Sequence, residues 1–275
     1  MEIVNCVALY QNGVYVENVT PIHRLHNLVD RMRPVKTHFP LIRIGCHHDG
    51  GYLVPDDLND ISACFSPGVE VNSSFEMDLL KKTGIESHLA DYSVDEPPVN
   101  LKPKSFIKKF LGPNNNAIHI TLETWMKSQG EYQLGQDFLL QMDIEGDEYL
   151  TLLTTPQKVI QRFRIIVLEI HHVECWAHPK FFNIVEAMFE KILTDFYVVH
   201  NHPNNHGALL DLNGFVAPQY FEITLLRKDR SPALDYCRDF PHPLDSACYA
   251  NRVELTLPHR WYGAPFPAQA ECGQA

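Results

Sequence analysis

Apolar residues along the chain show two spacing patterns, one typical of buried strands and one typical of amphipathic helices. From residue 61 onward, short apolar runs alternate with stretches in which apolar residues recur at helical spacing. Strand followed by helix, repeated, predicts an α/β fold with a mostly parallel sheet and helices on both faces. We expect strands at residues 61–67, 85–91, 117–122, 137–143, 164–170, 196–202 and 220–228, and helices near 73–83, 147–162 and 180–194.

The residues before this core predict two smaller elements. Apolar side chains from Leu25 to Met32 are spaced as one face of a helix, which Pro34 ends. Two short apolar runs then flank the turn residues Asp49 to Gly51. This pattern predicts a hairpin, or a strand followed by a loop.

Proline-rich stretches divide the rest of the chain. Residues 93–116 contain several prolines and an asparagine run, so we expect a surface excursion with at most one short helix. The tail after residue 231 is rich in proline and histidine and lacks periodicity, which predicts an extended strap. We therefore expect an N-terminal helical and hairpin extension at residues 1–60, a core domain at 61–230 and a C-terminal strap at 231–275.

Charge and cysteine usage narrow the classes of function. The chain carries 23 Lys and Arg against 34 Asp and Glu, and its net charge of −11 opposes binding to a phosphate backbone. No apolar run reaches the roughly 18 residues of a membrane span, and the N-terminus lacks a signal-peptide pattern. Seven cysteines without a CxxC pair are typical of a reducing compartment. We expect a cytoplasmic protein that neither spans a membrane nor binds nucleic acid.

Candidate ligand-binding residues follow the first two predicted strands of the core. Ligands of open α/β sheets bind outside the carboxyl ends of the strands. The first strand leads through Gly68, Ser73 and Ser74 into a helix, which suits a small anionic group. The second ends at Asp91, a position from which a carboxylate can accept hydrogen bonds from ribose hydroxyls. An ordinary capped helix and a plain turn explain the same residues equally well.

Acidic residues and histidines gather after three later strands. Because the carboxyl ends of parallel strands meet at one edge of the sheet, we expect these side chains to converge there. For any single member a structural role is also open, such as an acid at a helix N-terminus or a histidine packed in the core. The residues are Asp143, Glu145, Asp147 and Glu148 after the fourth strand, His171 and His172 after the fifth, and His200, His202 and His206 at the sixth.

Several segments resemble one enzyme family. FSPGV with the following SSFE, HLADYS, TLETW, LLQMDIEGDEYLTLL and IIVLEIHHV resemble the FkbM-type family of S-adenosylmethionine-dependent methyltransferases, whose signature is similar to DIEGxE at a strand end. The resemblance runs from about Ile44 to Arg230, and DGGY at Asp49 to Tyr52 is also similar. The first loop departs from the family's common D-x-G-A-N-x-G pattern.

The resemblance implies a class I methyltransferase (Rossmann-like) sheet with an antiparallel last strand, and S-adenosylmethionine as cofactor in the domain at 61–230. Gly68 and its neighbours would face the methionine part, Asp91 the ribose, and Asp143 the methionine ammonium or the reaction centre. The acceptor would be a hydroxyl of a sugar, nucleotide-sugar or glycan, which is carbohydrate modification by O-methylation. The cofactor-binding residues would be Phe65, Ser66, Gly68, Ser73, Ser74, Asp91, Tyr92, Ser93 and Asp143.

A hydroxyl acceptor must lose its proton as it attacks the methyl group. Neutral imidazole suits this task near pH 7, so the candidate bases are His171, His172, His200 and His202. A second route is a divalent metal ion held by Asp143, Glu169 and His202, which would lower the pKa of the hydroxyl.

Two functions from other classes compete with methyl transfer. One is a metal-dependent hydrolase that uses the same histidines and acids, although the chain lacks HExxH and similar ligand frames. The other is a binding domain without catalytic activity. The clusters of polar side chains at the strand ends argue against it, because a fold that needs no site gains nothing from them.

Overall fold

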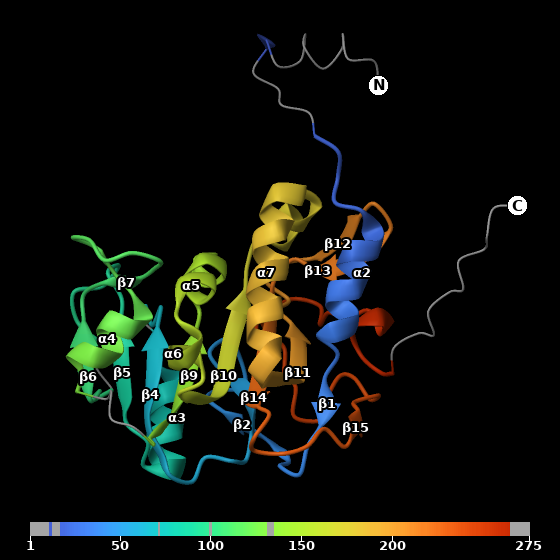
Figure 1. The fold of residues 1–275 in the computed structure, drawn as a ribbon. Coiled ribbons are helices and arrows are strands. Elements are labelled where there is room, and N and C mark those ends of the chain that lie inside the picture. Colours follow the sequence, from blue (N-terminus) through green and yellow to red (C-terminus); the bar gives the residue numbers. More distant parts are fainter. Residues whose placement is uncertain (1–10, 13–16, 71, 99–100, 131–134, 265–275) are drawn as a thin grey trace, which may run out of the picture.

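A seven-stranded sheet forms the centre of the molecule (Figure 1). The structure is a computed structural model that describes residues 11–12, 17–70, 72–98, 101–130 and 135–264. Neighbouring strands are parallel except at β14, which runs antiparallel to both of its neighbours. The fold is therefore mixed α/β with a mostly parallel sheet, as predicted. From edge to edge the strands are β11 (Phe196–Pro203), β14 (Phe221–Arg227), β10 (Phe163–Ile170), β9 (Asp137–Met142), β4 (Ile61–Pro67), β5 (Ser87–Ala90) and β6 (Ser105–Ile107).

Both faces of the sheet are covered, as the continuous apolar runs predict. Along β10, Ile166 and Leu168 pack in one core cluster, whereas Ile165 and Val167 pack in another on the opposite face. The structure contains the predicted helices at 73–83 and 180–194, the N-terminal helix and the hairpin. The first cluster includes residues of α2 (Ile22–Arg31), α4 (Leu122–Ser128), α5 (Glu148–Thr154) and α7 (Pro179–Asp195), and the second includes α3 (Ser74–Thr83), β2 (Leu41–Ile44) and β3 (Tyr52–Pro55).

The predicted single helix at 147–162 is wrong. Helix α5 ends at Thr154, and the short helix α6 (Gln157–Ile160) begins after Pro156. Thr155 between them is extended, with a ψ of 127°. Its conformation follows from the next residue, because a proline ring clashes with a preceding residue in helical conformation.

The stretch at 93–116 differs from the expected surface excursion because it supplies β6, the third parallel strand. Only three residues long and half-buried at the edge of the sheet, β6 has no apolar run that sequence periodicity could detect. The strand predicted at 117–122 is reduced to β8 (His119–Ile120), which pairs with β7 (Phe110–Leu111) outside the central sheet.

The C-terminal strap lies along the domain as far as residue 264 and carries little regular structure. Its β15 (Asp235–Tyr236) pairs with β1 (Val35–Lys36), and η2 (His259–Trp261) buries Trp261 in the core. A hairpin of β12 (Leu209–Leu212) and β13 (Phe215–Pro218) was not predicted. Within the described part of the chain, no helix is both long and apolar enough to cross a membrane.

Candidate functional site

A cavity of about 690 Å³ opens at the carboxyl ends of β4, β5 and β9. These strands bring Gly68, Asp91 and Asp143 to its wall, which confirms that the predicted strand ends meet there. Asp49 from the β2–β3 turn and Tyr249 from the strap also line the cavity. The cavity is therefore lined by the sheet edge, by the turn of the N-terminal hairpin and by the C-terminal strap.

The loop after β4 lies against the loop after β9. Gly68 has a φ of +83°, and a Cβ atom there would lie 1.5 Å from the backbone oxygen of Asp143. The Gly68 N–H donates to the Ala90 carbonyl oxygen at 3.0 Å. Only glycine fits this conformation and this close approach.

Asp91 connects the loops after β4 and β5. Only 2% of the residue is exposed. Its Oδ2 accepts from the Glu70 N–H at 2.8 Å, and its Oδ1 accepts from the Ser93 N–H and hydroxyl, both at 2.7 Å. A carboxylate oxygen has two lone pairs, so Oδ2 keeps the capacity to accept one further hydrogen bond.

An apolar end of the cavity is formed by β7, β8 and the segment between them. Phe110, Leu111, Ile118 and His119 line this end. The Phe110 and His119 rings lie 5.9 Å apart, and each of Phe110 and Ile118 is 37% exposed. Sequence reasoning missed all four as site residues. Phe110 and Leu111 form a strand too short to show a pattern, and Ile118 and His119 fall in the strand predicted at 117–122, which was not assigned to the site.

His171 lies in an acidic surrounding behind the cavity wall. Its Nδ1 is 3.3 Å from Glu148 Oε1, and its Nε2 is 3.7 Å from Asp143 Oδ1 and 3.6 Å from Glu145 Oε2. Burial lowers its pKa, but Glu148, Asp143 and Glu145 outweigh that effect and raise the pKa to about 9. The imidazolium form therefore dominates at neutral pH, the opposite of what a general base needs.

The adjacent His172 lies beyond the end of β10 and points elsewhere. Its backbone has a φ of +57°, its ring lies against Gly146, and its Nδ1 is 3.4 Å from Glu174 Oε1. Half of its side chain is exposed. Neither histidine of the pair lines the cavity.

The two histidines of β11 are buried against acids rather than open to the cavity. His200 Nε2 lies 2.8 Å from Asp245 Oδ1, and His202 lies between Glu222 and Glu254. Burial lowers the pKa of His202, but these acids raise it to about 10. The histidine of this segment that lines the cavity is His206. Its ring centroid lies 4.8 Å from that of Tyr249.

Among the other predicted cofactor residues, Ser93 lines the cavity, whereas Phe65, Ser66 and Tyr92 do not. Phe65 is fully buried and packs on Trp125 and Phe138, while the buried Ser66 hydroxyl contacts Glu76 and Gln141. Tyr92 is 38% exposed and does not line the cavity, whereas Ser93 does.

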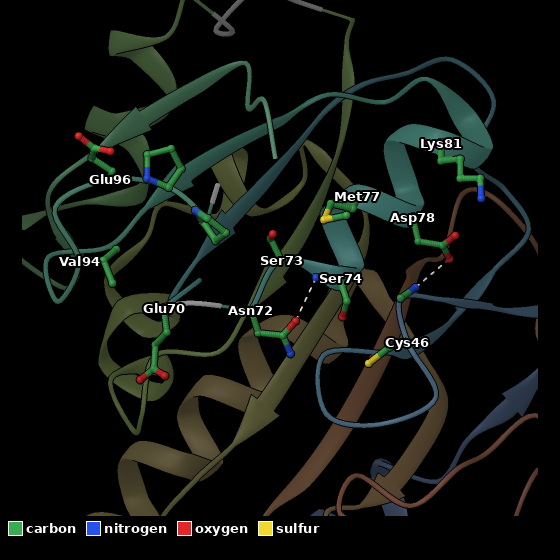
Figure 2. A pocket seen from close by; sticks show the side chains of 13 residues that line it. Cys46, Glu70, Asn72, Ser73, Ser74, Met77, Asp78, Lys81, Val94 and Glu96 are labelled. Carbon is green, nitrogen blue, oxygen red and sulfur yellow. Dashed lines mark hydrogen bonds between the residues drawn. The ribbon is translucent and has the colours of Figure 1, made fainter. Parts of the chain in front are cut away.

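Ser73 and Ser74 line a neighbouring groove, which Figure 2 shows beside the start of α3. The groove shares Glu70 and Asn72 with the cavity. The Ser74 hydroxyl donates to the Gly50 carbonyl oxygen at 2.9 Å. These serines therefore support the wall rather than form it.

Among the described residues, two groups of side chains could hold a metal ion. One is Asp143, Glu145 and His171, and the other is His202, Glu222 and Cys248; in each, the ligand atoms lie within 4.8 Å of one another. The predicted set of Asp143, Glu169 and His202 is divided, with Asp143 in one group and His202 in the other. Glu169 is in neither, and its Oε1 accepts from Asn204 Nδ2 at 2.7 Å.

Comparison with known proteins shows no family for the chain. No protein-family model and no curated protein matches the chain. One solved structure with some similarity is a Pyrococcus horikoshii protein that is described provisionally as an RNA methyltransferase. The match covers 62% of this chain and 76% of that one, with 10% sequence identity and a TM-score of 0.28. Membership of the FkbM-type family stays a prediction.

Proposed function

We propose that the chain is an S-adenosylmethionine-dependent methyltransferase that binds its cofactor in the 690 Å³ cavity. The observation that carries this proposal is the strand order β6-β5-β4-β9-β10, with β4 and β9 as neighbours at the centre. In a doubly wound sheet this is the point where the strand order reverses, and ligands bind outside it. The cavity opens there, between Gly68 and Asp143. The antiparallel β14 agrees with the class I methyltransferase sheet that the resemblance implies.

The lining residues fit each part of the cofactor. Asp91 would accept hydrogen bonds from the ribose hydroxyls, and the apolar end at Phe110 and Ile118 would hold the adenine ring. Asp143 Oδ1 is buried without a hydrogen-bond partner among the described residues, which suits the ammonium group of the methionine part. When bound, S-adenosylmethionine supplies an electrophilic methyl group for an in-line displacement, so the protein's main task is alignment.

The proposed acceptor is a hydroxyl of a small polar molecule, such as a sugar, nucleotide-sugar or glycan. Asp49, His206 and Tyr249 line the cavity from the β2–β3 turn, the loop after β11 and the strap. An acceptor bound between these polar and aromatic groups would lie next to His206. Of His200, His202 and His206, only His206 lines the cavity, so we assign it as the general base. The acidic net charge of −11 disfavours nucleic acid as the acceptor.

Two assays test the proposal. Calorimetry should detect S-adenosylmethionine and its demethylated product in the wild-type protein, and the absence of binding would overturn the cofactor assignment. Transfer of a labelled methyl group should be detected with a nucleotide-sugar and not with bulk RNA at physiological salt. Transfer to RNA alone would overturn the acceptor assignment. Adding a chelator separates metal-assisted proton removal from direct removal by a histidine.

A further inference from the structure

A buried cluster away from the cavity wall combines a nitrogen, an oxygen and a sulfur ligand. His202 is near the end of β11, Glu222 is in β14, and Cys248 belongs to the strap. The three residues are between 3% and 5% exposed, and their ligand atoms lie within 4.8 Å of one another. Three segments that are distant in sequence therefore meet in one small polar site.

The distances in the cluster are close to those of a tetrahedral metal site. His202 Nδ1 lies 3.2 Å from Glu222 Oε2, and Cys248 Sγ lies 3.2 Å from Glu222 Oε1. Zinc binds nitrogen and oxygen at about 2.0–2.2 Å and sulfur at about 2.3 Å, so tetrahedral ligand atoms lie about 3.3–3.6 Å apart. The nitrogen–oxygen and sulfur–oxygen contacts are close to that spacing, and all three ligand atoms lie within 4.8 Å of one another.

Metal binding at the cluster would release protons from the ligands. His202 Nδ1 and Cys248 Sγ both face the Glu222 carboxylate, and a divalent ion bound to them would displace the protons that they donate there.

Glu254 holds the histidine in the orientation that a metal needs. Its Oε1 lies 3.1 Å from His202 Nε2, on the side of the ring away from Glu222. A carboxylate at this position keeps the proton on Nε2 and leaves Nδ1 as the metal ligand, an arrangement common at histidine ligands of zinc.

We propose that His202, Glu222 and Cys248 bind a zinc ion that fastens the strap to β11 and β14. The thiolate and imidazole ligands favour zinc over magnesium or calcium, which prefer oxygen. The Cys248 carbonyl oxygen accepts from the Asp49 N–H at 3.1 Å, and Tyr249 lines the cavity. The ion would therefore also fix one rim of the cavity, whether or not the methyltransferase proposal holds.

Cobalt substitution tests the site directly. The full chain, reduced and stripped of metal with a chelator, is titrated with Co²⁺ and monitored for the thiolate-to-cobalt charge-transfer band. We expect one ion per chain, release of about two protons per ion in weak buffer, and displacement by Zn²⁺. Cys248→Ser should abolish the charge-transfer band, whereas Cys175→Ser, which alters a half-buried cysteine outside the cluster, should leave it unchanged.

A milder variant keeps the test valid if Cys248→Ser does not fold. Glu254→Gln retains all three ligands and should weaken Co²⁺ binding about 10- to 100-fold, because it removes the carboxylate that orients His202. A wild-type protein that develops no charge-transfer band would overturn the proposal. An unchanged band in folded Cys248→Ser would overturn it as well.

Discussion

Replacing Asp91 with alanine should weaken binding of S-adenosylmethionine while the protein stays folded. The carboxylate is 2% exposed and already accepts three hydrogen bonds, from the Glu70 N–H and from the N–H and hydroxyl of Ser93. A hydrogen bond to a charged group contributes about 1.5–3 kcal/mol. Loss of one such bond to the ribose therefore corresponds to a rise in Kd of about 10- to 150-fold.

A control variant separates the ribose contact from the support that Asp91 gives to the loop. Ser93→Ala removes the hydroxyl that donates to Asp91 Oδ1 but leaves the carboxylate in place. Calorimetry should show a much smaller loss of affinity for this variant than for Asp91→Ala, and thermal denaturation without ligand checks folding. Unchanged affinity in a folded Asp91→Ala protein would refute the ribose assignment. Equal losses in the two variants would instead assign the effect to the loop.

Three further predictions concern the loop after β4, the proton acceptor and the acid stability of the sheet. Gly68→Ala should abolish cofactor binding in calorimetry because the new Cβ would strike the Asp143 carbonyl oxygen, whereas Gly84→Ala, also at positive φ but with no atom within 4 Å, should retain it. His206→Ala should lower turnover by about a hundredfold to ten-thousandfold with cofactor affinity nearly unchanged, and a loss of less than about threefold would assign the base elsewhere. Burial raises the pKa of Asp137, but hydrogen bonds from Arg227 and Arg164 outweigh it and lower the pKa. Its stabilisation is therefore present above the unfolded value of about 3.9 and lost as the pH falls through the lowered pKa. In urea unfolding, the stability difference between wild type and Asp137→Asn should shrink from pH 7 to pH 3, and a constant difference would contradict this account.

The sequence predicts best those elements whose apolar residues are buried on two faces. Strand β10 is buried along its whole length from Phe163 to Ile170, and the apolar run from Ile165 to Leu168 within it predicts it clearly. Strand β6 has three half-buried residues, so its pairing with β5 depends on tertiary contacts that periodicity does not report.

The candidate site was predictable only where its residues follow predicted strands. Gly68, Asp91 and Asp143 meet in the cavity for that reason. Phe110 reaches it from the two-residue strand β7 and Tyr249 from the strap, and only the packing of the chain brings them there. His202 lies at a strand end, where the sequence draws attention to it. Its partner Glu254 is 52 residues further along the chain, in the strap, and no local sequence pattern indicates this contact.

The position of β14 between β10 and β11 has a consequence for synthesis of the protein. Both neighbours precede β14 in the chain, so a nascent polypeptide that ends before Phe221 has two sheet edges without their final partner. Open edges of this kind pair readily with other chains. Release of the strand that begins at Phe221 from the ribosome should therefore mark the point at which the nascent protein becomes resistant to aggregation.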